Sequence, residues 1–251
     1  MCLIVLAYKA HAAFPLILGA NRDEFLDRPA EPAHFWPDAP EIFAGRDKRA
    51  GGTWMGITRG GRFAAITNYR NMRVSYPPGP SRGALVREAL EGGIDTAGTT
   101  AYAGFNLIYG PLDALRYHNN IDHRDEPLTP GVHALSNHLL DTPWPKVVKS
   151  KAVMNTLLDQ SPEAITDGLF QLLADRTIAP DDQLPDTGMP LEMERAASPA
   201  FIHTPNYGTR CSTVVLVDAK GQVYFEERTW PGGGVVREMF GMGKEFVERG
   251  S

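Results

Sequence analysis

Short runs of apolar residues, separated by turns rich in glycine and proline, dominate the pattern of this chain. The runs at 2–8 and 15–20 flank a short polar stretch, which predicts an antiparallel pair of core strands. Gly60-Gly61 between two β-rich runs is typical of a type I′ hairpin turn, which requires positive φ at both central residues. The two runs of this hairpin are 53–58 and 63–67. Two more strand pairs are expected, 104–109 with 113–118 and 212–218 with 222–227.

Helical periodicity is confined to a few segments. Apolar residues recur at spacings of three and four in 145–159 and 162–175, which predicts two central amphipathic helices. Ser161 and Pro162 suit the N-cap and the first turn of the second of these helices. Two further helices are expected, a short one over 82–91 and a final one over roughly 235–248.

Two proline-rich stretches show little periodicity. Four prolines fall between residues 28 and 40, and five fall between residues 176 and 209, so we expect irregular structure in both. A loop as long as the second one is usually functional or disordered when it occurs in a compact domain. Because no internal repeat or linker divides the chain, we expect one domain over residues 1–251.

The order of the elements limits which fold classes are possible. Several strands precede two central helices, more strands follow, and alternating strand–helix–strand units are absent. This order favours an α+β fold with a largely antiparallel sheet. It is compatible with two stacked sheets flanked by helices.

Composition narrows the range of partners. The 251 residues carry a net charge of −5 with no run of like charge, which argues against a nucleic-acid binder. No apolar stretch reaches the length of a membrane span, and the N-terminal stretch lacks the basic region of a signal peptide. The only cysteines are Cys2 and Cys211, too few for a disulfide scaffold or a four-cysteine zinc site. We therefore expect a cytoplasmic protein with no integral membrane segment.

Cys2 is the clearest candidate for a catalytic residue. If Met1 is removed, as a small second residue favours, Cys2 carries both a thiol and a free α-amine. An amine with an ordinary pKa near 8 can accept the thiol proton at neutral pH, so the residue can activate itself. The alternative is that Cys2 is a small buried residue at a strand start. Retention of Met1 would exclude the amine mechanism.

Polar residues at the ends of other runs are candidates for a site around Cys2. Asn21-Arg22-Asp23-Glu24 follows the second run, either as a solvated strand end or as a group that binds an ammonium and lowers a thiol pKa. Asn68 and Asn137 each follow a β run, where a side-chain amide can stabilise an oxyanion or simply cap a turn. Arg210 precedes the last hairpin and can bind a substrate oxygen or pair with Asp23.

The sequence lacks the usual motifs of metal and nucleotide sites. Its seven histidines form no HExxH pattern, and no Cys-x-x-Cys occurs, so we expect no metal site. Gly232-Gly233-Gly234 lacks the Lys-Ser/Thr of a phosphate-binding loop, so we interpret it as a linker or a helix entry.

A set of short motifs runs in order across nearly the whole chain and is jointly specific. The motifs are Met1-Cys2, Asn21-Arg22-Asp23-Glu24, Gly51-Gly52-Thr53-Trp54-Met55-Gly56, Thr67-Asn68-Tyr69-Arg70, Ser81-Arg82-Gly83, Gly104-Phe105-Asn106-Leu107, Leu135-Ser136-Asn137, Pro143-Trp144-Pro145-Lys146 and Tyr207-Gly208-Thr209-Arg210. With these motifs the chain resembles the NRDE family, also called the transport and Golgi organisation protein 2 family.

The resemblance implies a fold and a site. The family is similar to N-terminal-nucleophile hydrolases, whose fold is a four-layer αββα sandwich with mostly antiparallel sheets. In the bile-salt hydrolase and penicillin V acylase group, an N-terminal cysteine attacks an amide carbonyl. By motif, the comparable residues here are Cys2, Arg22, Asp23, Asn68, Asn137 and Arg210. Arg22 and Asp23 are adjacent here but separated in the acylases, and adjacent strand residues point to opposite faces. Both reach Cys2 only if a turn or bulge intervenes.

Two functional hypotheses follow from the resemblance. The first is a Cys2-dependent hydrolase of a linear amide or thioester in a small-molecule substrate, with no cofactor. In this hypothesis Asp23 holds the ammonium, Arg22 favours the thiolate, the two asparagines polarise the carbonyl, and Arg210 binds or orients the substrate.

The second hypothesis is a non-enzymatic carrier. Family members are linked to haem mobilisation, to lipid and acyl-CoA handling, and to secretory-pathway organisation. The carrier would bind haem or an acyl-CoA-like amphiphile, with 176–209 as a lid and the histidines near 118–138 at the ligand. The Cys2→Ala substitution separates the two hypotheses, because only a hydrolase needs the thiol. The sequence indicates neither the substrate nor the oligomeric state.

Overall fold

The structure is a computed structural model that describes residues 2–243, and these contain thirteen strands and four α-helices. The strands are β1 (Cys2–Tyr8), β2 (Leu16–Phe25), β3 (Ala30–Trp36), β4 (Ala39–Asp47), β5 (Met55–Thr58), β6 (Arg62–Asn68), β7 (Phe105–Pro111), β8 (Arg116–Asn119), β9 (Asp125–Pro127), β10 (Gly131–Leu135), β11 (Tyr207–Val217), β12 (Gln222–Thr229) and β13 (Val235–Gly241). The helices are α1 (Arg82–Glu91), α2 (Pro145–Leu157), α3 (Pro162–Leu173) and α4 (Leu191–Ala197), with short 3₁₀ helices at Ala97–Ala101 and Asp181–Gln183.

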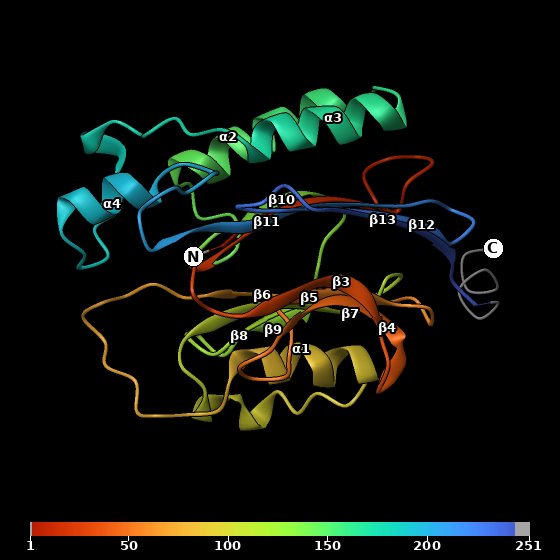
Figure 1. The fold of residues 1–251 in the computed structure, drawn as a ribbon, viewed down its shortest axis with the longest axis horizontal. Coiled ribbons are helices and arrows are strands. Elements are labelled where there is room, and N and C mark those ends of the chain that lie inside the picture. The colour runs from red at the N-terminus through yellow and green to blue at the C-terminus, as the bar shows by residue number, and fades with distance from the viewer. Residues whose placement is uncertain (1, 244–251) are drawn as a thin grey trace.

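These elements form four layers (Figure 1). One antiparallel sheet has the strand order β10-β1-β2-β11-β12-β13, and the other has the order β3-β4-β5-β6-β7-β8-β9. The two sheets stack face to face, α2 and α3 cover the outer face of the first sheet, and α1 covers that of the second. The α+β fold and the αββα sandwich expected from the sequence are therefore confirmed.

The strand pair β1 and β2 lies at the centre of the first sheet and is buried on both faces. Ile4 and Leu6 pack between the sheets, whereas Val5 and Ala7 pack against the helices. A strand that is covered on both faces needs apolar residues at every position, which explains the unbroken apolar run in β1. Side chains alternate between the two faces along a strand, so Cys2, two residues before Ile4, also lies on the face between the sheets.

β2 is longer than the sequence pattern predicted. It continues through Phe25, so the stretch from Asn21 to Glu24 lies within the strand and does not form its solvated end. The ladder continues because β11 pairs with β2 along its whole length, from Leu16 to Phe25. Polar side chains are tolerated there when they find partners: Asn21 is fully buried and donates to the main-chain carbonyls of Leu173, at the end of α3, and Ala200, after α4.

Three other sequence expectations were wrong. The stretch 28–40 is not irregular, because it holds β3, an edge strand that accommodates Pro32 at a register shift. Residues 235–241 form the edge strand β13, not the start of a helix, and 244–248 lie outside the described residues. The hairpin between β5 and β6 exists, but only Gly61 has positive φ (+76°), so its loop is not a type I′ turn.

The helices in the middle of the chain agree with the sequence. The predictions for 82–91, 145–159 and 162–175 correspond to α1, α2 and α3. Ser161 caps α3 as expected, and its hydroxyl accepts a hydrogen bond from the backbone of Ala164.

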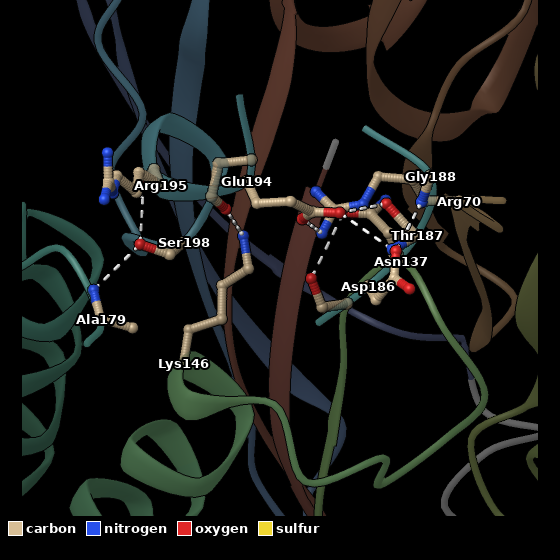
Figure 2. Close-up of polar contacts among 12 residues, drawn as sticks. Arg70, Asn137, Lys146, Ala179, Asp186, Thr187, Gly188, Glu194, Arg195 and Ser198 are labelled. Carbon is tan, nitrogen blue, oxygen red and sulfur yellow. Dashed lines mark hydrogen bonds and ion pairs between the residues drawn. The ribbon is translucent and has the colours of Figure 1, made fainter. Parts of the chain in front are cut away.

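The proline-rich stretch from 176 onward is more ordered than expected. It contains α4, and Glu194 of this helix is buried. The carboxylate of Glu194 accepts hydrogen bonds from Arg70 at 2.8 Å and from the backbone and hydroxyl of Thr187 (Figure 2). This buried polar cluster fixes the segment to the rest of the domain.

A close approach of two glycines sets the position of α1. A Cβ at Gly52 would lie 2.4 Å from the carbonyl oxygen of Gly83, which is closer than any side chain tolerates. The backbone of Thr53 also donates to the Gly83 carbonyl, at 3.3 Å. These contacts hold the start of α1, and with it Arg82, against the segment that precedes β5.

Candidate active site

A cavity of about 520 Å³ opens where the two sheets meet near the start of β1. Its walls come from β1, β2 and β11 of the first sheet, from β4 and β6 of the second, and from the start of α1. Figure 1 places the N-terminal end of the chain between the sheets at this side of the molecule. Cys2 lines the cavity from β1.

Neighbouring strands bring a row of side chains together beside the thiol. In the sheet register Cys2 pairs with Arg22, Arg22 pairs with Cys211, and Cys211 pairs with Thr229. All four residues line the cavity. Arg22 is therefore the immediate cross-strand neighbour of Cys2, as its predicted role requires.

The buried thiol of Cys2 needs a nearby base to become a thiolate. The side chain is 7% exposed, and burial raises the pKa of its thiol. The charge of the Asp23 carboxylate adds to this rise, whereas a backbone hydrogen bond from Asp23 and the charge of Arg22 lower the pKa. Ser136 fixes the residue further by donating from its hydroxyl to the Cys2 carbonyl at 3.1 Å. A thiol with a raised pKa is protonated at neutral pH, so a nearby base is needed to form the thiolate.

Asp23 approaches Cys2 from the other face of the sheet. As the residue after Arg22 it points toward the helix layer, where Thr209 donates to its carboxylate at 2.7 Å. Burial raises the pKa of Asp23 to about 6, while the charge of Lys146 and the Thr209 hydrogen bond oppose the rise. The carboxylate is thus mostly ionised at pH 7. It follows the cross-strand partner of Cys2, so it flanks the N-terminal side of that residue.

The structure explains how adjacent residues serve one site. Arg22 and Asp23 do point to opposite faces, yet both line the cavity and both act on the Cys2 thiol, from its two sides. The bulge lies in the partner strand β11, where the register shifts between Thr209 and Cys211. The extra residue in that bulge is Arg210, which thereby also lines the cavity.

The two asparagines have different places. Asn68 ends β6, is exposed and lines the cavity. Asn137 follows β10, is fully buried, and donates from its side-chain amide to the Asn68 carbonyl at 2.9 Å. Asn137 does not line the cavity, so the geometry makes Asn68 the amide that faces a ligand and Asn137 the residue that fixes it.

Arg210 presents a cation to the cavity. Its guanidinium donates to the carbonyl oxygens of Phe25 and Arg28, both at 2.9 Å. The hydroxyl that donates to the carboxylate of Asp23 belongs to Thr209. Because the contacts of Arg210 are to neutral carbonyls, its charge is available to a ligand.

Sequence reasoning missed Arg82 as a site residue. It is the first residue of α1, lines the cavity, and donates to the Gly104 carbonyl at 3.0 Å. Burial lowers the pKa of Arg82, and the ionised form of Cys2 is the strongest opposing charge. The motif Ser81-Arg82-Gly83 was a signal for it, but only the folded chain brings this arginine to the cavity that Cys2 lines.

Arg82→Gln is expected to slow alkylation of Cys2 at pH 7 by up to about tenfold, because loss of a nearby cation raises the thiol pKa by up to about one unit. The rate is measured with iodoacetamide and peptide mass analysis. Arg87→Gln is the matched control, since Arg87 lies on the same helix and pairs with Glu91 at the surface. Equal rates in the two variants would rule out this role.

Cys211 is a second thiol in the same cavity and serves as an internal reference. Burial raises its pKa well above the ordinary value, and the nearby carboxylate of Glu227 adds to the rise. Glu227 is itself buried, and it accepts a hydrogen bond from the backbone of Ala33 at 2.8 Å. Cys211 is therefore expected to be the less reactive thiol.

The features that favoured a carrier lie elsewhere. The rings of His118, His133 and His138 contact Thr99, Asp141 and Thr142 respectively, and none of the three lines the cavity. No residue of 176–209 lines it either. Within residues 2–243 no group of three or more His, Cys, Asp or Glu side chains is placed to hold a metal ion. Over the same residues, no helix is both long and apolar enough to cross a membrane.

The sequence model of the family described as Transport and Golgi organisation 2 matches residues 1–232. The chain belongs to this family. A mouse member, Transport and Golgi organization 2 homolog, is 36% identical over 260 residues, which cover 91% of this chain and 93% of the mouse protein. The human homolog is 35% identical with the same coverage, and the Drosophila melanogaster protein is 26% identical over 92% of this chain and 93% of its own length. The Transport and Golgi organisation 2 name itself specifies no chemical reaction.

Distant similarity to solved structures accompanies this membership. A Caenorhabditis elegans N-acylethanolamine-hydrolyzing acid amidase ortholog is 12% identical, with a TM-score of 0.49 over 86% of this chain and 92% of its own. The C2A mutant of the conjugated bile acid hydrolase from Clostridium perfringens is 11% identical, with a TM-score of 0.43 over 98% and 94%. The layers of this Transport and Golgi organisation 2 family member are established by its own strand order and packing.

Proposed function

We propose that this protein is a cysteine hydrolase that cleaves a linear amide or thioester, with Cys2 as the nucleophile once Met1 has been removed. The observation that carries the proposal is the position of Cys2 in the cavity. Its cross-strand neighbour Arg22 and the buried carboxylate of Asp23 approach it from two faces of one sheet. A thiol that served only to pack the core would not need a charged group on each side.

The first half of the reaction uses the two groups of Cys2. The α-amine accepts the thiol proton, and the thiolate sulfur attacks the carbonyl carbon of the substrate. The carbonyl oxygen becomes an oxyanion, which the side-chain amide of Asn68 is placed to stabilise. The carbon–nitrogen or carbon–sulfur bond then breaks, and the ammonium returns its proton to the leaving amine or thiol. The acyl group remains on the sulfur.

The second half regenerates the enzyme. The α-amine accepts a proton from water as the water oxygen attacks the carbonyl carbon of the acyl-enzyme thioester. The carbon–sulfur bond then breaks, the carboxylic acid leaves, and the ammonium returns the proton to sulfur. Asp23 is suited to hold the ammonium that forms in both halves, because it is mostly ionised at pH 7. Arg22 and Arg82 favour the thiolate.

The cavity indicates a small-molecule substrate. Its volume of about 520 Å³ lies within the range of ordinary ligand pockets, roughly 300–1,000 Å³. The guanidinium of Arg210 at its wall is placed to bind or orient an oxygen of the substrate.

Acylation of Cys2 tests this function. The protein is incubated with a panel of acyl thioesters and N-acyl amides, and its mass is followed over time. We expect an acyl adduct on Cys2 that disappears as free acid is released. Adducts confined to Cys211 or to surface lysines, with no release of acid that depends on Cys2, would overturn the proposal.

A further inference from the structure

Glu227 is a buried carboxylate at the wall of the cavity, and the proposed reaction does not use it. The residue lies on β12, is 4% exposed, and lines the cavity. Its Oε1 accepts a hydrogen bond from the backbone of Ala33, on β3 of the other sheet, at 2.8 Å. A neutral amide oxygen would serve that bond as well. The contact between the sheets therefore explains an acceptor at this position but not its negative charge.

No cation of the described chain pairs with this charge. Two other carboxylates of the cavity have such partners, because Asp47 is bonded to Arg28 at 2.5 Å and Glu31 to Lys48 at 3.0 Å. Among residues 2–243, no lysine or arginine nitrogen lies within 4.0 Å of the Glu227 carboxylate. Burying a carboxylate without a counter-ion is costly, so this arrangement points to a cation that a ligand supplies.

The second oxygen of Glu227 is accessible from the cavity. A Cβ at Gly45, which also lines the cavity, would lie 3.7 Å from Oε2, so the glycine leaves this oxygen uncovered on the side of β4. Cys211 offers the carboxylate only a neutral thiol, and Arg22 pairs with Glu24 at 3.8 Å. Burial raises the pKa of the Glu227 carboxyl, and a cation bound beside it would lower that pKa again.

We propose that Glu227 is a binding residue for an ammonium group of the substrate, at the end of the cavity remote from Cys2. The inference rests on the proposed function and narrows its substrate class to acyl compounds that carry a cationic amine. In the strand order β1-β2-β11-β12, three spacings separate the strand of Cys2 from that of Glu227. At about 4.8 Å per spacing, the amine would lie roughly 14 Å from the reacting carbonyl.

Binding is tested without turnover by isothermal titration calorimetry at pH 7. The probes are octylamine, which is an ammonium ion at this pH, and octanol, which has the same chain and no charge. We expect octylamine to bind at least about tenfold more tightly, because a hydrogen bond between charged groups is stronger than one to a hydroxyl. Octylamine that binds no better than octanol, or that does not bind at all, would overturn the inference.

Glu227→Gln decides whether the carboxylate causes this preference. The glutamine keeps an oxygen for the backbone of Ala33 and removes only the charge, so we expect the preference for octylamine to disappear. Glu31→Gln is the matched control, since Glu31 lines the same cavity but already has Lys48 as its partner. A preference that survives in Glu227→Gln, or that falls equally in Glu31→Gln, would contradict the assignment.

Gly45→Ala provides a second variant in which the carboxylate is retained. Its methyl group would lie 3.7 Å from Oε2, where it obstructs a bound ammonium, so we expect weaker binding of octylamine. Unchanged binding of octylamine would count against the site. Thermal unfolding followed by circular dichroism confirms that each variant is folded, and Gly45→Ala carries the test if Glu227→Gln does not fold.

Turnover separates this inference from the proposed function. Thioesters of N-acetylcysteamine are compared that carry either a plain acyl chain or an ω-aminoacyl chain of the same length, about ten to twelve carbons. We expect kcat/KM to be at least about tenfold higher for the ω-aminoacyl thioester, and Glu227→Gln to remove the difference. Equal values for the two thioesters would overturn the inference alone. Amine binding that depends on Glu227, in a protein that releases no acid, would refute the hydrolase proposal alone.

Discussion

Cys2→Ala is expected to abolish acyl release, with a loss of at least about 10³-fold in turnover, because it removes the nucleophile. The fold should survive, since Cys2 is the first residue of β1 and the substitution removes one sulfur atom at the wall of a cavity. Turnover is measured as released acid, and folding as the thermal midpoint.

The matched control for this variant is Cys211→Ala. Cys211 is equally buried and lines the same cavity two strands away, so its loss should leave most of the turnover. Turnover in Cys2→Ala equal to that of the unmodified protein would remove Cys2 from the mechanism. Saturable binding of haemin or of an acyl-CoA-like amphiphile that persists in Cys2→Ala, in a protein without turnover, would instead favour the carrier hypothesis.

Glu194→Ala is expected to lower the free energy of unfolding by about 3–5 kcal/mol, because it breaks a buried ion pair with Arg70. It also removes the acceptor for the backbone and hydroxyl of Thr187. The stability is measured by urea unfolding at neutral pH.

Glu192→Ala is the control for this prediction. Glu192 lies on the same helix, and its partner Arg195 is at the surface, so the change should stay within about 0.5 kcal/mol. If both substitutions cost the same small amount, the polar cluster of Figure 2 does not anchor α4.

The parts of the fold that were predictable have a pattern set by their own residues. The run at 2–8 is apolar throughout because β1 is covered on both faces, and the period in 162–175 follows from the packing of α3 on one sheet face. The strands that were missed are held by their neighbours. β3 contains Pro32 and forms because β4 pairs with it, and the polar end of β2 forms because β11 continues beside it.

The residues of the site also divide into those with a signal in the sequence and those that only packing brings together. Cys2 was identified from its place at the start of the chain, and Arg22 and Asp23 from the polar motif that follows the second apolar run. The structure adds the register that pairs Cys2 with Arg22. Arg82 comes from a helix of the opposite layer, and only the packing of that helix brings it to the cavity that Cys2 lines. No spacing in the sequence predicts this approach, although Arg82 belongs to a motif that the sequence displays.

The most direct test of the central claim, that Cys2 is an N-terminal nucleophile, is the mass of the intact mature protein before and after brief reaction with a thiol probe. We predict a mass lower than that of the full sequence by one methionine residue, followed by a single label on Cys2 while Cys211 remains unmodified. Retention of Met1, or labelling of Cys2 no faster than that of Cys211, would contradict the account.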